Sequence, residues 1–308
     1  MSGESLTKTS RKLAEQFEVE KFHATTLIHT ETAHIQAKAD FAAYEELGAK
    51  EYKYLATLDY ATCSVCQPLD GMVFKLSEAR EGVNYPVMHP RCRCTTTINT
   101  DYVNRRARNP LTGKSELVRG DMNYREWIES LTPEQRSALE LSRKKDSRKT
   151  SDKLQYEQYK KVLGKENMPK SFDKWQDLKY NDSEKYAEYK LSYADKSLQS
   201  KIRSSYNLTI LEGRQGKHIL GHNNYIDGRS YLTVSIEKAQ ELVKQYAGTG
   251  EIQRDRKGKW SNKELVQADR DIGVVLSLNA EKSLTSKFMI HYSKNGTHIV
   301  PTNREFKE

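Results

Sequence analysis

All four cysteines of the chain lie in one short segment with a histidine, at the spacing of metal ligands. Two residues separate Cys63 from Cys66, and the second group reads His89-x2-Cys92-x-Cys94. Zinc in proteins prefers four nitrogen and sulfur ligands at about 2.0–2.3 Å, and a C-x2-C pair supplies two of them from one tight turn. The spacing predicts a structural zinc site, whose ligands are Cys63, Cys66, His89 and either Cys92 or Cys94.

Two disulfides in a secreted protein are the alternative to this zinc site. The first 22 residues contain no apolar core of a signal peptide, and a chain of 308 residues forms a sufficient core without covalent cross-links. We therefore expect a reducing compartment and free thiols. A catalytic zinc is less consistent with the sequence, because no glutamate that would serve as a base on a metal-binding helix lies nearby.

Composition restricts the class of protein further. The mean hydropathy is −0.85, and no apolar run approaches the roughly 20 residues that cross a bilayer, so we expect no membrane partner. The net charge of +9 is uneven, because residues 1–105 carry −2, residues 106–200 carry +5 and residues 201–308 carry +6. A basic domain of this kind binds a polyanion or simply keeps the protein soluble, and charge alone does not separate the two.

Hydrophobic periodicity predicts an α+β protein. In the first third we expect a helix over residues 10–48 and short strands within 51–66, 71–76 and 92–102. The charged, turn-rich stretch 103–124 resembles a linker. Short helices follow to residue 200, and their tyrosines have the spacing of an inward helical face, although stacking on nucleic acid is an alternative.

The last third of the chain predicts a small antiparallel sheet with helices. A strand is expected at 230–234, a helix at 235–248 with Ser235 as its N-cap, and one or two elements within 264–278. Asn295-Gly296 between alternating strands predicts a two-residue type I′ turn. In that register the facing pairs are Lys294–Thr297, Ser293–His298, Tyr292–Ile299 and His291–Val300.

The hairpin brings residues with acid–base chemistry onto one face. Because side chains alternate, His291, Ser293 and His298 share a face, and Lys294 and Thr297 project to the mostly apolar other face. Two imidazoles can divide the work of general base and general acid, as metal-free RNA cleavage requires. Two half-exposed histidines without a catalytic role are the simpler interpretation.

A second cluster lies in residues 213–234, which are rich in glycine and asparagine. It includes His222 and the candidate residues for acid–base chemistry and phosphate binding, Arg214, Lys217, His218, Arg229 and Ser230. The segment does not contain the G-x4-G-K-[ST] pattern of a P-loop.

The segment around the cysteines resembles the Mu F-like head-morphogenesis (minor head protein) family of tailed phages. Residues 54–74 and 85–96 carry that family's motif, at Asp59, Thr62, Cys63, Cys66, Leu69, Asp70, Gly71, His89, Pro90, Cys92, Arg93 and Cys94. The resemblance covers about residues 20–100, although members usually have a longer N-terminal part. It implies a virion protein, located in the phage head, with capsid or portal partners.

Residues from about 200 to the end are similar to the polymorphic-toxin type 50 domain, a predicted RNase of the barnase–EndoU–colicin E5/D–RelE superfamily. The similar stretches are residues 216–232, 259–266 and 291–301. The resemblance implies a small sheet with helices at one edge, RNA as substrate and cleavage without a metal. It also implies action in the cytoplasm of a bacterial host, a cognate immunity protein and a prophage origin.

We therefore expect three parts: a minor-head module at 1–105, a linker and helical region at 106–199, and a ribonuclease domain at 200–308. The expected catalytic residues are His218, His291, Ser293 and His298. The expected phosphate-binding residues are Arg214, Lys217, Arg229, Ser230, Lys294 and Thr297. The alternatives are a structural virion protein with a nucleic-acid-binding C-terminal domain, and an ADP-ribosyltransferase. The transferase needs an NAD pocket and a catalytic glutamate, for which the sequence offers no convincing set.

Overall fold

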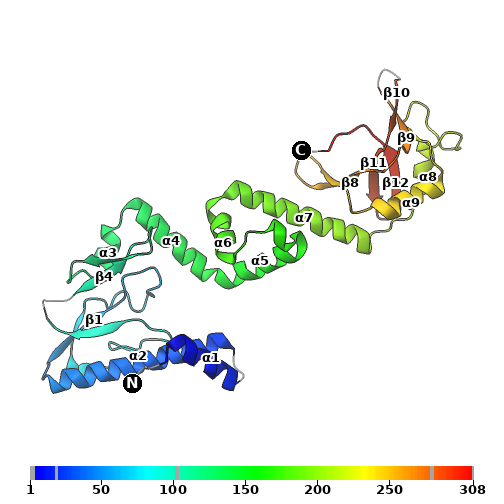
Figure 1. The fold of residues 1–308 in the computed structure, drawn as a ribbon. Coiled ribbons are helices and arrows are strands. Elements are labelled where there is room, and N and C mark those ends of the chain that lie inside the picture. The colour runs from blue at the N-terminus through cyan, green and yellow to red at the C-terminus, as the bar shows by residue number, and fades with distance from the viewer. Residues whose placement is uncertain (1–3, 18–19, 101–103, 278–280, 307–308) are drawn as a thin grey trace. The chain divides into compact units, whose positions relative to one another are not determined.

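The computed structural model describes residues 4–17, 20–100, 104–277 and 281–306. The chain forms two compact units, Met1–Thr150 and Ser151–Glu308, and each is described here by itself. Helices come first, a helical region lies in the middle and small antiparallel sheets form the C-terminal part, so the α+β prediction is confirmed (Figure 1).

The predicted helix 10–48 is two helices. Helix α1 (Leu6–Gln16) begins at Ser5, whose side chain accepts a hydrogen bond from the Lys8 N–H, and it ends at Phe17. Helix α2 (Lys21–Glu46) packs against α1 and ends just before Gly48, whose φ of 66° suits glycine. The apolar spacing continues across the junction, and for this reason periodicity alone does not reveal the break.

A three-stranded antiparallel sheet forms the centre of the first unit. Strand β1 (Glu51–Leu55) lies between β2 (Val73–Lys75) and β3 (Thr95–Ile98), and the 3-10 turn η1 (Leu76–Glu78) follows β2. Tyr52 and Tyr54 of β1 are fully buried, and Ala37 and Tyr44 of α2 lie in the same core as Tyr52. The cysteines lie in the loop after β1 and in the segment before β3, so the sheet brings the two groups together.

Residues 105–118, which lie inside the stretch that the sequence analysis interprets as a linker, form regular structure. Strands β4 (Arg105–Arg108) and β5 (Ser115–Val118) form an antiparallel hairpin, in which Arg105 and Ala107 point inward and Arg106 and Arg108 outward. The Arg105 guanidinium donates to both carboxylate oxygens of buried Asp70, at 2.6 and 2.7 Å. The charge of Arg105 therefore belongs to a buried ion pair and not to a solvent-exposed linker.

Two helices complete the core of the first unit around this hairpin. Helix α3 (Tyr124–Ser130) and helix α4 (Pro133–Ser147) both begin with a capping box, formed by Asn123 with Glu126 and by Thr132 with Gln135. Tyr124 and Trp127 of α3 pack in one cluster with Ala107 of β4 and Leu58.

The second unit begins with a helical bundle. Helices α5 (Lys149–Leu163), α6 (Phe172–Asn181) and α7 (Ser183–Ser205), with the 3-10 turn η2 (Lys165–Asn167), enclose an aromatic core around Trp175. The Tyr159 and Tyr193 rings stack at 4.3 Å. The prediction that these tyrosines form an inward helical face is confirmed. Asp152 is buried beneath them and accepts hydrogen bonds from Gln176, Lys179 and Tyr180.

Helix α7 continues into the C-terminal part of the second unit. Gln199 donates to the Gly250 carbonyl at 2.7 Å, Asp195 forms an ion pair with Arg254, and Ile202 is buried in the C-terminal core. The predicted boundary between residues 199 and 200 thus falls inside a helix. The limits 1–105, 106–199 and 200–308 remain predictions as domain boundaries.

Two small sheets form the C-terminal part. One has the order β12-β11-β8-β7, from Gly296–Pro301, Lys287–Ser293, Trp260–Gln267 and Glu251–Arg254. The other has the order β10-β9-β6, from Lys282–Thr285, Gly273–Leu276 and Tyr231–Leu232. Helix α9 (Ile236–Tyr246) begins at Ser235 as predicted, because that side chain accepts from the Lys238 N–H.

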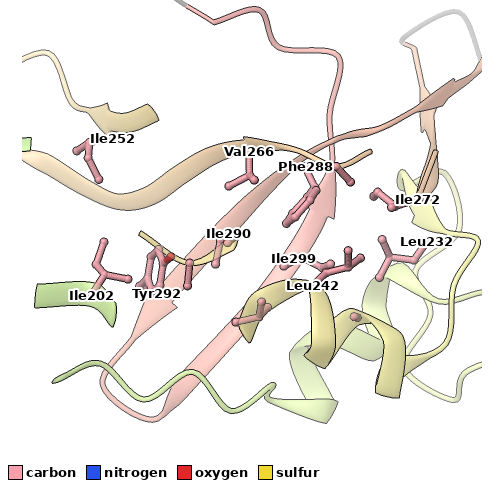
Figure 2. Close-up of a cluster of buried hydrophobic side chains, with 14 residues drawn as sticks. Ile202, Leu232, Leu242, Ile252, Val266, Ile272, Phe288, Ile290, Tyr292 and Ile299 are labelled. Atoms are coloured by element: carbon pink, nitrogen blue, oxygen red, sulfur yellow. The ribbon is translucent and has the colours of Figure 1, made fainter. Parts of the chain in front are cut away.

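One hydrophobic core joins α9 and the strands. Figure 2 shows the helix residue Leu242 beside the strand residues Phe288, Ile290 and Ile299. Glu264 of β8 is fully buried on this side, and its carboxylate accepts hydrogen bonds from the N–H groups of Gly248 and Gly250 and from the Tyr292 hydroxyl. The core therefore packs on one face of the β12-β11-β8-β7 sheet, and His291, His298 and Lys263 lie on the opposite face.

Candidate functional site

The β11–β12 hairpin forms, but the predicted register is wrong. Lys294 and Asn295 are the turn residues, and the facing pairs are Ser293–Gly296, Tyr292–Thr297 and His291–His298. Neither turn residue has a positive φ, so the turn is not type I′. A Cβ atom at position 296 would lie 2.4 Å from the Thr209 carbonyl oxygen, so the glycine serves this close approach.

The neighbouring segment explains this register. Thr297 donates its N–H to the Thr209 carbonyl and accepts from the Leu211 N–H, both at 2.8 Å. Pairing of β12 with residues 209–211 thus places Gly296 inside the ladder rather than in the turn. Relative to the predicted register, each residue of β11 pairs with a residue two positions earlier in β12. Because side chains alternate with a period of two, each one stays on its predicted face of the sheet.

Ile290, Tyr292, Thr297 and Ile299 face the core, whereas His291, Ser293 and His298 occupy the opposite face. Lys263 of β8 faces His291 across the next strand pair. The sequence analysis missed this lysine. The alternation of side chains along β8 would identify its face, but only if the pairing of β8 with β11 were known.

A third imidazole joins this face from a distant part of the chain. His218 ends the 3-10 turn η3 (Gly216–His218), which directly follows the short helix α8 (Glu212–Gln215). The ring centroid of His218 lies 6.3 Å from that of His298, and the centroids of His298 and His291 are 4.6 Å apart. We call these three residues the histidine row. In the order of the strands, Lys263 follows His291 at the far end of the row.

One hydrogen bond defines the tautomer of His218. Its Nδ1 lies 2.8 Å from the Ser230 carbonyl oxygen, which only accepts, so Nδ1 carries the hydrogen. In the neutral ring the lone pair is then on Nε2. The His218 side chain is buried, and burial lowers the pKa of the imidazole below its ordinary value.

The other two imidazoles are more strongly perturbed. Burial, together with the charges of His298 and Lys263, lowers the pKa of His291 to about 3. Burial, together with His218 and Arg214, lowers the pKa of His298 to about 4. At pH 7 all three rings are therefore neutral within a positively charged surrounding, which disfavours their protonation and favours the binding of an anion.

The remaining predicted residues have diverse positions. Ser293 donates its hydroxyl to the Gly296 carbonyl, and the Ser230 hydroxyl accepts from the Leu276 N–H. Thr297 is fully buried on the core side, where its hydroxyl donates to the Leu208 carbonyl, and this position does not favour phosphate binding. The exposed side chains are those of Arg214, Arg229 and Lys294, whereas Lys217 is half-buried.

The first unit contains a separate candidate site, the thiol cluster of Cys63, Cys66, His89, Cys92 and Cys94. All four thiols are free, so the structure contains neither of the two disulfides considered as an alternative. The ligand atoms form two overlapping triads, Cys63–Cys66–His89 and Cys66–Cys92–Cys94, in which all atoms lie within 4.8 Å of one another. Cys66 belongs to both triads.

The chemistry of this donor set fits a metal ion. His89 Nε2 lies 3.2 Å from the Cys63 sulfur and 3.4 Å from the Cys66 sulfur. His89 Nδ1 is 2.9 Å from the Pro90 carbonyl, which gives Nδ1 the hydrogen and leaves Nε2 free to ligate. A hydrogen bond from Cys94 lowers the pKa of Cys92 to about 5, whereas burial raises the pKa of Cys66 to about 11.

Other motif residues support the turns that carry these ligands. The Cys66 and Gln67 N–H groups both donate to the Cys63 carbonyl at 3.1 Å, which forms the first turn. Buried Asp59 accepts from the Arg93 guanidinium, with one oxygen–nitrogen distance of 2.7 Å, and links the first turn to the second.

The structure thus defines an α+β protein with a thiol cluster in one unit and a row of imidazoles in the other. Residues 1–97 match the family model of Phage Mu protein F like proteins, and residues 210–301 match the family model Bacterial toxin 50. One segment of the chain is therefore similar to phage Mu F-like proteins and another to bacterial toxin domains, as the motifs indicate. A search of curated proteins found no match. Among the described helices, none is both long and apolar enough to span a bilayer.

Proposed function

We propose that the toxin domain is an endoribonuclease that cleaves RNA without a metal ion. The histidine row is the observation that carries this proposal, because it places three neutral imidazoles beside Arg214, Lys217 and Lys263. Acid–base cleavage of RNA needs two proton-transfer groups and a cation near the phosphate. The imidazoles would serve as the proton-transfer groups, and the nearby basic side chains would supply the cation.

His218 is suited to the role of base. Because Nδ1 donates to Ser230, Nε2 is the atom that takes the proton of the ribose 2′-OH. The 2′ oxygen then attacks phosphorus, and the bond from phosphorus to the 5′ oxygen breaks. The products are a 2′,3′-cyclic phosphate and a 5′-hydroxyl.

His291 is suited to the role of acid. It lies at the opposite end of the row from His218, with His298 on the intervening strand β12, so the two can flank one phosphate. The negative charge of the bound phosphate raises the pKa of a nearby imidazole. His291 can then hold the proton that it gives to the 5′ oxygen, while His298 and Lys263 stabilise the charged phosphorane.

The test is an RNA cleavage assay with the full-length chain. We expect cleavage of total RNA in EDTA, fragments that end in a 2′,3′-cyclic phosphate, and no change when magnesium is added. His218→Ala and His291→Ala proteins serve as inactive controls from the same purification. Activity that disappears in EDTA and returns with magnesium contradicts the proposed chemistry.

A purely structural role is the second candidate, and the match to the phage Mu F-like family favours it. In that case the basic C-terminal domain binds nucleic acid and leaves it intact. An ADP-ribosyltransferase is less consistent with the structure, because buried Glu264 lies on the core side of the sheet, opposite the histidine row. Binding of RNA without cleavage by the wild-type chain would favour the structural role.

For the first unit we propose a zinc-binding minor-head module. Cys63, Cys66, His89 and one of Cys92 and Cys94 would hold the ion, which would link the loop after β1 to the segment before β3. The module would associate with capsid or portal proteins in the phage head and so carry the nuclease in the virion. The nuclease would then act in the cytoplasm of a bacterial host, where a cognate immunity protein would restrain it.

A further inference from the structure

Gln215 forms a paired contact with the main chain of the edge strand β12. Its side-chain amide donates to the Ile299 carbonyl at 3.0 Å, and its oxygen accepts from the Ile299 N–H at 2.8 Å. The Gln215 side chain is fully buried. A primary amide used in this way presents the same donor and acceptor as a peptide group of a neighbouring strand.

This contact completes the outer edge of β12. Residues 209–211 satisfy the main-chain groups of Thr297, Gln215 satisfies those of Ile299, and residue 301 is a proline that has no N–H. A sheet edge with unpaired polar groups is costly when it is buried. The side chain of Gln215 therefore replaces the strand at the point where the chain turns into α8 and η3.

The same contact sets the position of a catalytic candidate. Gln215 is the last residue of α8, and His218 ends the 3-10 turn that follows three residues later. At its other end, the His218 ring is held by the Ser230 carbonyl. We propose that Gln215 is a positioning residue, which holds the His218 imidazole against His298 by attaching α8 to the edge of β12.

The consequence for catalysis rests on the proposed ribonuclease function, whereas the attachment itself does not. The decisive variant is Gln215→Met, which keeps the length of the side chain and removes both hydrogen bonds. A displacement of about 1 Å in a reacting group can lower a rate by about a hundredfold. We expect kcat to fall by about 10–100-fold with little change in KM, because substrate contacts stay in place.

Gln240→Met is the matched control. Gln240 of α9 also uses its amide on main-chain groups, accepting from the Ile210 N–H at 2.8 Å and donating to the Leu208 carbonyl at 2.9 Å. It anchors the segment before α8 rather than the turn that carries His218. We expect its kcat to remain within about twofold of wild type, because its hydrogen bonds hold residues 208 and 210 and not the turn that carries His218.

Gln215→Glu tests rescue. A buried carboxyl group tends to be protonated, and a neutral carboxyl offers one donor and one acceptor, as the amide does. We expect this variant to retain more activity than Gln215→Met. It also keeps the test decisive if the methionine variant does not fold.

NMR titration of His218 separates failure of this inference from failure of the proposed function. If the attachment holds, the pKa of His218 moves toward its ordinary value of about 6.5 in Gln215→Met and not in Gln240→Met. Unchanged His218 titration in Gln215→Met would overturn the attachment, whether or not the wild-type chain cleaves RNA. A shifted titration with unchanged kcat would overturn the catalytic consequence.

Discussion

The imidazoles of His291 and His298 face each other directly across β11 and β12, with ring centroids 4.6 Å apart. Two like groups in a partly buried site with Arg214 and Lys263 nearby do not hold protons easily, and their pKa values are lowered to about 3 and about 4. The pair therefore stays uncharged until an anion binds. The pair should therefore lower the stability of the ligand-free protein as the pH falls.

We predict that this pair makes the C-terminal sheet less stable as the pH falls. In the unfolded chain both histidines protonate near pH 6.5, whereas in the folded protein they do so only near pH 3 to 4. Their contribution is therefore complete above about pH 6.5 and is lost as the pH falls toward about 3. Hydrogen-exchange protection of β11 and β12 amides, measured at pH 7 and pH 5, reports this loss locally.

The double variant His291→Asn, His298→Asn is the comparison for the acid sensitivity. It removes both titrating groups from the sheet, so protection should depend less on pH than in the wild-type chain. An identical pH dependence in the two proteins would show that other groups cause the acid sensitivity.

Substitution of the proposed acid and base should abolish most of the cleavage. We expect His218→Ala and His291→Ala each to lose more than about a hundredfold in rate, the usual scale for a general acid or base. Because the two act in one step, the double variant should be little worse than either single variant. Rates of RNA cleavage measure this loss, and His23→Ala, at an exposed position of α2, is the control. Full activity in both single variants would rule out the assignment.

The thiol cluster should contain close to one zinc ion per chain when the protein is purified without a metal-affinity tag. Elemental analysis checks the ratio. Cys63→Ser should lower the zinc content and unfold the first unit, because ion binding and folding are coupled in small metal modules. His34→Ala, which changes a histidine outside the cluster, should keep the zinc. Protein with two disulfides and no metal would contradict the prediction.

Tyr292→Phe should separate stability from catalysis. The Tyr292 hydroxyl donates to the buried carboxylate of Glu264, and a hydrogen bond to a charged group contributes about 1.5–3 kcal/mol. We expect a loss of stability of that size in urea unfolding, with RNA cleavage retained, because Tyr292 faces the core. Tyr206→Phe, on a ring that packs against Tyr292, controls for the loss of a hydroxyl. A large loss of cleavage would show that the two faces are coupled.

Arg105→Met should destabilise the first unit. Removal of one partner from a buried ion pair costs about 3–5 kcal/mol, because the Asp70 carboxylate would remain buried without its partner. Thermal unfolding and limited proteolysis of the 105–118 hairpin both report the loss. The neighbouring Arg106 is exposed on the other side of β4, and Arg106→Met should change stability far less. Equal effects would mean that the Asp70 pair does not anchor the hairpin.

Local features of the chain were predictable from the sequence. The C-x2-C spacing and the motif around Asp59 and Arg93 indicate the thiol cluster, because these contacts depend on short turns. Helix α9 begins at Ser235 as its cap predicts. The shared face of His291 and His298 also follows from the sequence, since alternation along a strand survives a shift of register by two residues.

Contacts between distant segments required the tertiary structure. Residues 209–211 decide the β11–β12 register, because Gly296 must approach the Thr209 carbonyl. In the 105–118 hairpin, Arg105 pairs with Asp70, which lies 35 residues earlier in the chain. His218 reaches the histidine row through Gln215, whose hydrogen bonds to Ile299 span 84 residues. Residue types and local spacing specify which side chains can take part in chemistry. Which of them meet is decided by close backbone approach and by the burial of paired polar groups, and both depend on the whole fold.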